Sequence, residues 1–263
     1  MELQVKDRVF MIAASGKGLG FGVARELAKN RAIVCISSRT KEKIEHTAQE
    51  LTKETGAIVF PFAMDASSGK SILLWRDAVV DKFGQIDGLL VNAGGPPAGR
   101  FSDFSDDDWQ QAFDLTLMSA VRMIRAVLPA MKKQQKGSIV AVTSLSVKEP
   151  IDNLLLSNVF RSGVTSLVKS LSTELAPYNI RVNNLMPGRI DTDRLRSLDE
   201  SIAKRTGQPL SDIQKQMVGR IPLGRYGTTE EFGKAGAFLL SDAASYITGA
   251  SLQVDGGLIK TVW

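Results

Sequence analysis

A glycine-rich turn near the amino terminus has the residue types and spacing of a phosphate-binding loop. It lies between an apolar run, Val9 to Ala13, and a helical pattern, Phe21 to Asn30. Glycines let the backbone turn tightly and approach an anion, and the following helix offers unpaired N–H groups and a positive dipole end. The turn therefore predicts a pyrophosphate site. Its residues are Ala14, Ser15, Gly16, Lys17, Gly18, Leu19 and Gly20.

Ser157 and Arg161 form a second pair with chemical potential, because side chains four residues apart share one face of a helix. A serine hydroxyl is a much weaker acid than a phenol, and an arginine is effectively never deprotonated, so neither suits acid catalysis near neutral pH. Arg161 nevertheless brings a permanent charge and several donors that can polarise a carbonyl. A bound water or Ser157 would then lie in the proton path. An alternative remains open, in which the two side chains only line a binding pocket.

The elements that must position these residues alternate regularly along the chain. Short β-branched runs alternate with segments of helical spacing, which is typical of repeated βαβ units. We therefore predict one α/β domain over residues 1–263, with a doubly wound parallel sheet and helices on both faces. Ligands in such folds bind at the carboxyl ends of the strands. The predicted strands are Val9 to Ala13, Ala32 to Ile36, Ala57 to Phe62, Gly88 to Val91, Ser138 to Val142 and Ile180 to Leu185.

Composition narrows the classes of function. The 33 basic and 28 acidic side chains leave a net charge of +5, but they form no long basic run, so we expect no nucleic-acid partner. The single cysteine, Cys35, lies in an apolar run and fits a reducing compartment. No apolar stretch has a signal-peptide pattern or the length of about 20 residues that spans a bilayer. We expect a cytoplasmic protein without a membrane partner and, lacking a Cys/His cluster, without a metal site.

The phosphate loop resembles the TGxxxGxG loop of the short-chain dehydrogenases/reductases. Gly18 and Gly20 match that pattern, whereas Ala13 and Ala14 replace its Thr-Gly. Because Ala14 carries a Cβ, it must take a negative φ or strain the turn, and Gly16 is the residue that could supply the missing flexibility.

Further matches to this family cover essentially the whole chain and imply a Rossmann-type fold similar to β-ketoacyl-acyl-carrier-protein reductases. The family's NNAG segment lets the nucleotide lie close to the backbone, an Asp accepts from the adenine amino group, and a PGxIxT turn meets the nicotinamide carboxamide. The resemblance thus implies these cofactor-binding residues: Asn92, Ala93, Gly94, Asp65, Ala66, Pro187, Gly188, Ile190 and Thr192.

The residues after the second predicted strand favour NADP(H) over NAD(H). An acidic residue there would bind the ribose hydroxyls of NAD and repel a 2′-phosphate, but the chain has Ser38. Arg39 could stack on adenine and pair with the 2′-phosphate, and Lys17 adds a second positive charge. In the alternative interpretation, both cations are ordinary solvated charges.

The family resemblance implies a catalytic set that this chain alters. In the family, a Ser polarises the carbonyl, a Tyr thirteen residues later exchanges a proton, and a Lys four residues beyond it binds the nicotinamide ribose. These roles fall at Ser144, Ser157 and Arg161, and a fourth position, an Asn that anchors a relay water, falls at Thr116. Only Ser144 is retained, and Arg161 is expected either to bind the nicotinamide ribose of the cofactor or to polarise the substrate carbonyl.

Two functions follow from this altered set. The first is an NADP(H)-dependent oxidoreductase that reduces a small-molecule carbonyl, such as a 3-oxoacyl thioester, or oxidises the alcohol. The alternative is a catalytically weak or silent nucleotide-binding protein with an assembly or sensing role. The sequence does not name the substrate, although several arginines hint at an anionic group if they are not simply solvated: Arg189, Arg194, Arg196 and Arg205.

Two expectations concern motion and assembly. The charged segment 188–226 interrupts the βαβ rhythm at the edge of the expected crevice and is interpreted as a mobile substrate lid. The resemblance also implies a homotetramer, or a homodimer, in which helices matching Trp109 to Met131 and Asn153 to Pro177 pack against partner copies.

Overall fold

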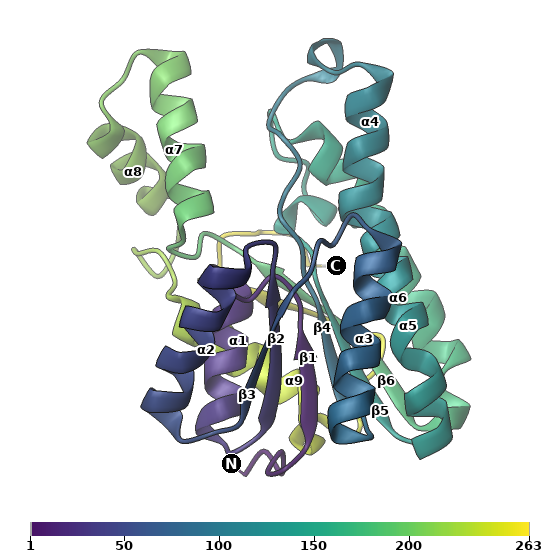
Figure 1. The fold of residues 1–263 in the computed structure, drawn as a ribbon. Helices are drawn as coiled ribbons and strands as arrows, with labels where there is room; N and C mark the ends of the chain where they lie inside the picture. The colour runs from purple at the N-terminus through teal and green to yellow at the C-terminus, as the bar shows by residue number, and fades with distance from the viewer. Residues whose placement is uncertain (1, 263) are drawn as a thin grey trace.

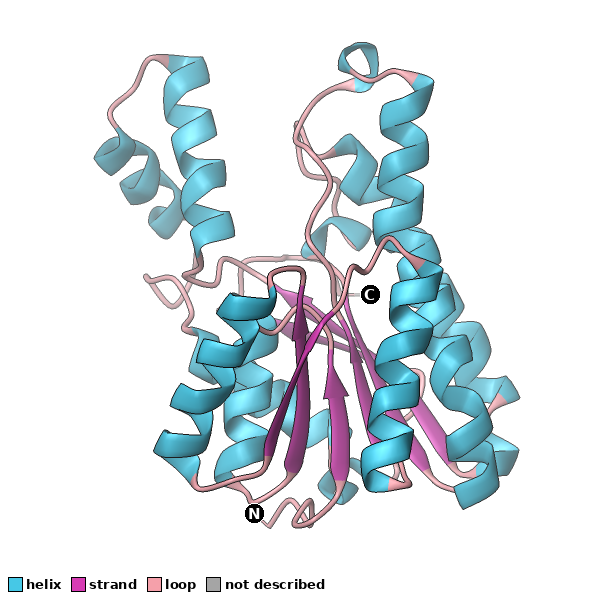
Figure 2. Cartoon of the chain, in the orientation of Figure 1, coloured by secondary structure: helices cyan, strands magenta, loops and turns pink. Residues whose placement is uncertain are grey.

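The sheet has seven parallel strands in the order β3-β2-β1-β4-β5-β6-β7 in a computed structural model that describes residues 2–262 (Figures 1 and 2). The order reverses direction between β1 and β4, which is the switch point where doubly wound folds bind ligands. The strands are β1 (Val9–Ile12), β2 (Ile33–Ser38), β3 (Val59–Ala63), β4 (Gly88–Val91), β5 (Gly137–Val142), β6 (Ile180–Pro187) and β7 (Ser251–Val254).

Helices cover both faces of the sheet, as the sequence predicted (Figure 1). One face carries α1 (Gly18–Lys29), α2 (Lys41–Thr55) and α9 (Thr229–Leu240). The other carries α3 (Gly69–Phe83), α5 (Ser119–Gln134) and α6 (Leu155–Glu174). Right-handed crossovers place their helices on one face while the strand order runs in one direction and on the other face after it reverses, so this arrangement follows from the reversal between β1 and β4.

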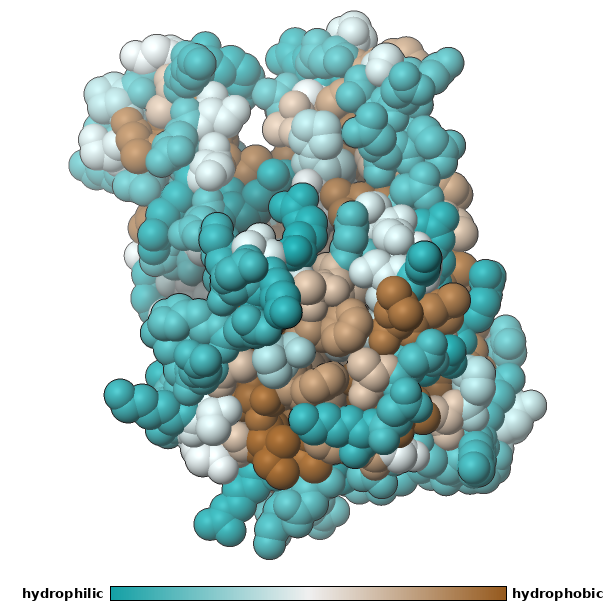
Figure 3. Space-filling model, in the orientation of Figure 1, coloured by the Kyte–Doolittle hydropathy of each residue, from teal (hydrophilic) through white to brown (hydrophobic). Residues whose placement is uncertain are grey.

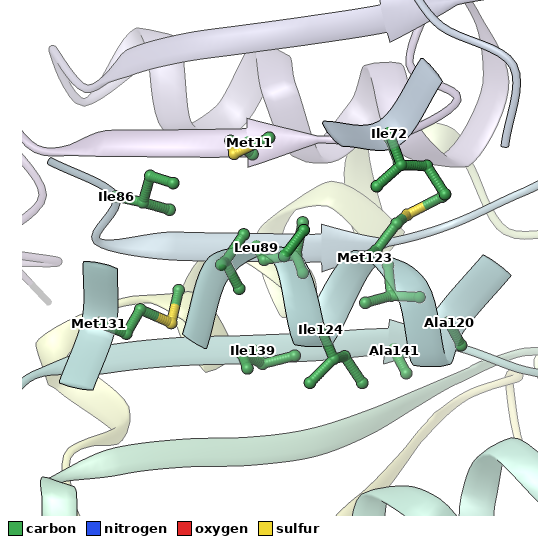
Figure 4. Close-up of a cluster of buried hydrophobic side chains, with 14 of the residues drawn as sticks. Met11, Ile72, Ile86, Leu89, Ala120, Met123, Ile124, Met131, Ile139 and Ala141 are labelled. Atoms are coloured by element: carbon green, nitrogen blue, oxygen red, sulfur yellow. The ribbon is translucent and has the colours of Figure 1, made fainter. Parts of the chain in front are cut away.

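Strand residues alternate between two hydrophobic cores, one on each face. Met11 and Leu89 belong to the core beneath α3, α5 and α6, whereas Phe10 and Leu90 belong to the core beneath α1, α2 and α9. Figure 4 shows Met123 of α5 close to the strands of the first core. Near-continuous apolar strands are expected where both faces of a parallel sheet are buried.

The six predicted strands are confirmed, with ends that differ by a few residues. The seventh strand, β7, pairs with β6 from Asn184 to Pro187 and was not predicted. Its residues are partly exposed and polar at Ser251 and Gln253, so it lacks the apolar signal of the central strands. At the opposite edge, β3 accommodates Pro61, which lacks an N–H and is tolerated at a sheet edge.

Two groups of helices extend beyond the carboxyl ends of the strands (Figure 1). Between β4 and β5, α4 (Asp106–Phe113) continues through a π-helical turn, η2 (Asp114–Met118), into α5. After β6, α7 (Asp193–Thr206) and α8 (Leu210–Gly219) form a separate projection. Short 3-10 turns complete the chain: η1 (Phe101–Asp103), η3 (Leu145–Val147), η4 (Ala176–Tyr178) and η5 (Asp242–Ala244).

Within residues 2–262, no helix has the combined length and apolar character needed to cross a membrane.

Candidate active site

The carboxyl ends of the central strands open into a hollow between the two projections. The space-filling view is hollowed between the α7–α8 projection and the projection that carries α4 (Figure 3). The phosphate loop follows β1, Asn92 follows β4, Ser144 follows β5 and Gly188 follows β6, so residues from distant parts of the chain meet at this edge. This is the place where the topology predicts a ligand.

Of the two possibilities given for Ala14, a negative φ or a strained turn, the phosphate loop adopts the strained turn. Ala14 has a φ of 48°, in the left-handed region, and Gly18 has a φ of 66°, whereas Gly16 keeps a negative φ. A left-handed alanine costs roughly 1–2 kcal/mol. Ser15 braces the loop, because its hydroxyl donates to the Ile12 carbonyl at 2.6 Å and accepts from the Ser37 N–H at 3.1 Å. Gly16 therefore does not supply the flexibility expected of it.

Close packing explains why glycine occupies the start of α1. A Cβ on Gly20 would lie 2.6 Å from the Ala14 carbonyl oxygen, so a side chain there would displace the loop. Gly18 and Leu19 stand at the amino end of the same helix, where N–H groups have no partner within the helix. The loop and helix end therefore have the form of an anion cradle.

The residues expected to select the nucleotide, near the end of β2 and in the phosphate loop, differ in whether a carboxylate already binds them. Ser38 is partly exposed and donates a 3.3 Å hydrogen bond to the Thr40 carbonyl. Arg39 is exposed and forms no ion pair with any residue from 2 to 262. Lys17, in contrast, pairs with Asp193 of α7, with Nζ and Oδ2 2.5 Å apart. Arg39 is thus free to meet a phosphate, whereas Lys17 would have to leave Asp193 first.

The strand ends after β3 and β4 leave room for a nucleotide. Asp65 is exposed, and its Oδ1 accepts from the Ser67 N–H and hydroxyl, while Ala66 is buried beside it. Asn92 donates from Nδ2 to the Ala14 carbonyl at 3.3 Å and joins β4 to the phosphate loop. Ala93 is partly buried, and a Cβ on Gly94 would meet no atom of the described chain within 4 Å. The residues present therefore fit a dinucleotide lying over this edge.

The turn after β6 is held tightly against β7. A Cβ on Gly188 would lie 2.5 Å from the Cα of Asp255, so only glycine fits after Pro187. Ile190 is buried, and Thr192 caps α7 by accepting from the Leu195 N–H. The turn thus fixes the start of α7 next to the phosphate loop, where Thr192 lies against Gly18.

Ser157 and Arg161 lie together at the end of β5. Nε of Arg161 donates to Oγ of Ser157 at 3.1 Å, and its Nη1 donates to the Val142 and Thr143 carbonyls at 3.0 and 3.2 Å. Ser144 forms no direct hydrogen bond to either side chain; its Oγ accepts from the Ser146 N–H at 3.1 Å. The structure thus unites Ser157 with Arg161 and leaves Nη2 of Arg161 without a bond to residues 2–262.

The Arg161 charge has no carboxylate partner within the described chain. Burial lowers the pKa of Arg161 to about 10, and repulsion from Arg194 adds to this effect. Arg161 therefore remains protonated at neutral pH, but in a site where its charge is poorly compensated. A poorly compensated charge in a site of low polarity acts strongly on any charge that develops nearby.

Thr116 lies in the π-helical turn and borders a small cavity with Asn92 and Arg161. Its hydroxyl is buried and has no hydrogen-bond partner among residues 2–262. The cavity's water-accessible volume is about 10 Å³, close to the space of one water. A water there would satisfy Thr116 and lie beside Arg161.

Two of the four arginines that hinted at an anionic substrate pair with carboxylates in the structure. Arg189 pairs with Asp199 and Arg196 with Asp191. Arg205 is exposed on the last turn of α7. Arg194 reaches across the hollow: its Nη2 donates to the Pro96 carbonyl, 98 residues away in the chain, at 2.8 Å. The sequence does not predict this contact, because every residue has a backbone carbonyl and no residue type marks this one as an acceptor.

Comparison with known proteins agrees with this geometry. A model of the enoyl-(acyl carrier protein) reductase family matches residues 13–259. The 3-oxoacyl-(acyl-carrier-protein) reductase of Chlamydia muridarum is 30% identical over 252 residues, covering 96% of this chain and 97% of the relative. An NADPH-dependent reductase of Bacillus subtilis is 30% identical over 258 residues, covering 98% and 99%. The crystal structure of L-sorbose reductase from Gluconobacter frateurii, with NADPH and L-sorbose, superposes with a TM-score of 0.94 at 28% identity and covers 100% of both chains.

Fold, site and comparisons define an oxidoreductase that acts on carbonyl or CH–OH groups. The chain belongs to the short-chain dehydrogenase/reductase family, as the sequence resemblance predicted. These matches favour the enzyme over the catalytically silent alternative.

Proposed function

We propose that this protein reduces the carbonyl of a small molecule with NADPH, or oxidises the corresponding alcohol with NADP⁺. The observation that carries the proposal is that Arg161 and Ser157 lie at the end of β5, in the same hollow as the phosphate loop. Relatives that are described as an NADPH-dependent reductase and as an NADPH complex support this cofactor. A 3-oxoacyl thioester is a candidate substrate because a similar protein acts on that class.

Each altered catalytic position has a role in this proposal. The nicotinamide supplies or accepts hydride when it is bound. Ser144 donates a hydrogen bond to the substrate oxygen, and the free Nη2 of Arg161 stabilises negative charge as that oxygen becomes an alkoxide. The proton passes from solvent to the alkoxide along a path through Ser157 or a water in the cavity beside Thr116, each of which regains the proton that it gives up, because Arg161 itself keeps its proton near neutral pH.

Deuteride transfer from labelled NADPH to a panel of ketones and 3-oxoacyl thioesters tests this function. Deuterium at the carbinol carbon of any product would support it. If the protein binds NADPH but transfers no deuteride to any compound of the panel, the proposed reaction is wrong and the silent nucleotide-binding protein becomes the better account.

We expect the double variant Ser38→Asp with Arg39→Leu to prefer NADH over NADPH. Arg39 is exposed at the end of β2, and hydrogen bonds to charged groups contribute about 1.5–3 kcal/mol, or about 10- to 100-fold in affinity. The new aspartate would also repel the 2′-phosphate and accept from the ribose hydroxyls. Titration calorimetry with both nucleotides measures the change. An unaltered NADPH preference would show that Ser38 and Arg39 do not determine the choice of nucleotide.

Lys17→Met provides the matched comparison for that experiment. Since Lys17 already pairs with Asp193, we expect its loss to weaken NADPH binding less than the loss of Arg39 does. A larger loss with Lys17→Met would mean that the lysine leaves Asp193 to bind the 2′-phosphate.

We also propose that segment 188–226 is a mobile lid. The projecting position of α7 and α8 (Figure 1) and the exposed charged side chains of α7, among them Arg196, Lys204 and Arg205, support the lid. We propose a cytoplasmic location, because the buried free thiol of Cys35 is compatible with a reducing compartment.

We further propose that the protein is a homotetramer. Light scattering at micromolar concentration should give four times the 28.5 kDa chain mass, and the mass of a monomer would contradict the tetramer.

A further inference from the structure

Arg161 and Arg194 are two cations that converge on the hollow without a carboxylate from residues 2–262. Arg161 comes from α6 and lines the cavity next to Asn92 and Gly94. Arg194 comes from α7 and lies on the loop after β4, where a Cβ on Gly95 would be 3.0 Å from its Nη2. The α6 side and the α7 side of the opening therefore each place a guanidinium beside the loop that follows β4.

The neighbouring basic residues make this pair distinctive. Arg189, Arg196 and Lys17 all have carboxylate partners within 3.1 Å. Arg161 and Arg194 instead donate to neutral oxygens, the backbone carbonyls and Ser157. Neutral acceptors satisfy hydrogen bonds but leave the two charges uncompensated. Like charges close together in a partly dry site are unfavourable until an anion joins them.

Both arginines keep donors available. Nη2 of Arg161 has no bond to the described chain, and neither do Nε and Nη1 of Arg194. Guanidinium groups bind carboxylates and phosphates through paired N–H donors. Arg194 is exposed, so a ligand can reach it, whereas Arg161 is partly buried at the reacting end of the site.

We propose that the substrate of this enzyme carries an oxyanion, a carboxylate or a phosphate ester, which binds between Arg161 and Arg194. This proposal rests on the function proposed above and narrows its substrate class to oxo acids or oxo phosphate esters rather than 3-oxoacyl thioesters. Arg194 is the specificity-determining residue, and its contact with Pro96 holds it across the opening before the substrate arrives. Arg161 serves both the oxyanion and the reacting carbonyl, which places the two groups of the substrate only a few bonds apart.

Matched pairs of charged and neutral ketones test the proposal. Acetoacetate is compared with methyl acetoacetate, and dihydroxyacetone phosphate with dihydroxyacetone, each as a substrate with NADPH. The wild type should have a higher kcat/KM for at least one anion than for its neutral partner. Arg194→Met should lower that value about 10-fold more than it lowers the value for the neutral partner. Arg196→Met, on the same helix but paired with Asp191, should change neither. The preferred pair distinguishes a carboxylate from a phosphate.

Calorimetric binding of the same four compounds to the NADP⁺-bound protein gives a readout that needs no turnover. Anion binding that Arg194→Met abolishes would support the oxyanion site even if no compound is reduced, in which case only the proposed reaction fails. Reduction of neutral ketones without any anion preference would overturn the oxyanion site while the reaction stands. The oxyanion site would also be overturned if none of the four compounds binds. A loss of NADPH affinity in Arg194→Met would overturn it too, because Arg194 would then bind the cofactor.

Discussion

Replacing Arg161 with methionine should slow hydride transfer about 100-fold, the typical loss when one charged or hydrogen-bonding donor to a developing oxyanion is removed. Arg161 lies at the end of β5, where its guanidinium contacts Ser157 and borders the cavity beside Thr116. Methionine keeps much of the side-chain length and removes the charge. Single-turnover deuteride transfer from labelled NADPH measures the effect on the chemical step.

Ser157→Ala is the matched variant for this experiment. A water can replace the serine hydroxyl in a proton path, so we expect a smaller loss than with Arg161→Met. NADPH affinity and thermal unfolding of both variants serve as controls, because Arg161 also binds the Val142 and Thr143 carbonyls. If Ser157→Ala abolishes transfer and Arg161→Met leaves it intact, the assignment of roles is wrong.

The sequence predicts the central part of the fold because burial leaves a clear pattern there. Strands β1, β4 and β5 are buried on both faces and appear as apolar runs bounded by turns. The edge strand β7 leaves no such pattern, since its residues are partly exposed and depend on hydrogen bonds to β6. Its position follows from tertiary pairing rather than from its own composition.

The sequence predicts the candidate site less completely, because several side chains there bind backbone oxygens. The four-residue spacing predicts that Ser157 and Arg161 share a face, and they do meet. Nothing in the sequence indicates that Arg161 reaches the Val142 and Thr143 carbonyls or that Arg194 reaches Pro96. The conformation of Ala14 was likewise open, because the Ser15 bonds that hold it strained come from tertiary packing.

The altered positions also make the site a test of what the family's tyrosine contributes. We expect Ser157→Tyr with Arg161→Lys to transfer hydride to neutral ketones at least about 100-fold faster than Ser157→Phe with Arg161→Lys, the usual range for a positioned general acid. Ser157 points toward the end of β5, since it contacts the side chain that binds Val142 and Thr143. Lysine in place of the broader guanidinium leaves more room for the ring.

The pH dependence separates proton donation by the phenol from mere filling of the site. A nearby lysine charge lowers the phenol pKa from about 10, and carbonyl reduction needs the protonated phenol. The reduction rate of the tyrosine variant should therefore fall as the pH rises through that lowered value. The phenylalanine variant has the same ring without the hydroxyl, so its rate should not show this fall. Equal rates and equal pH profiles for the two variants would mean that position 157 does not deliver a proton to the substrate, and that in the natural protein a water beside Thr116 does so instead.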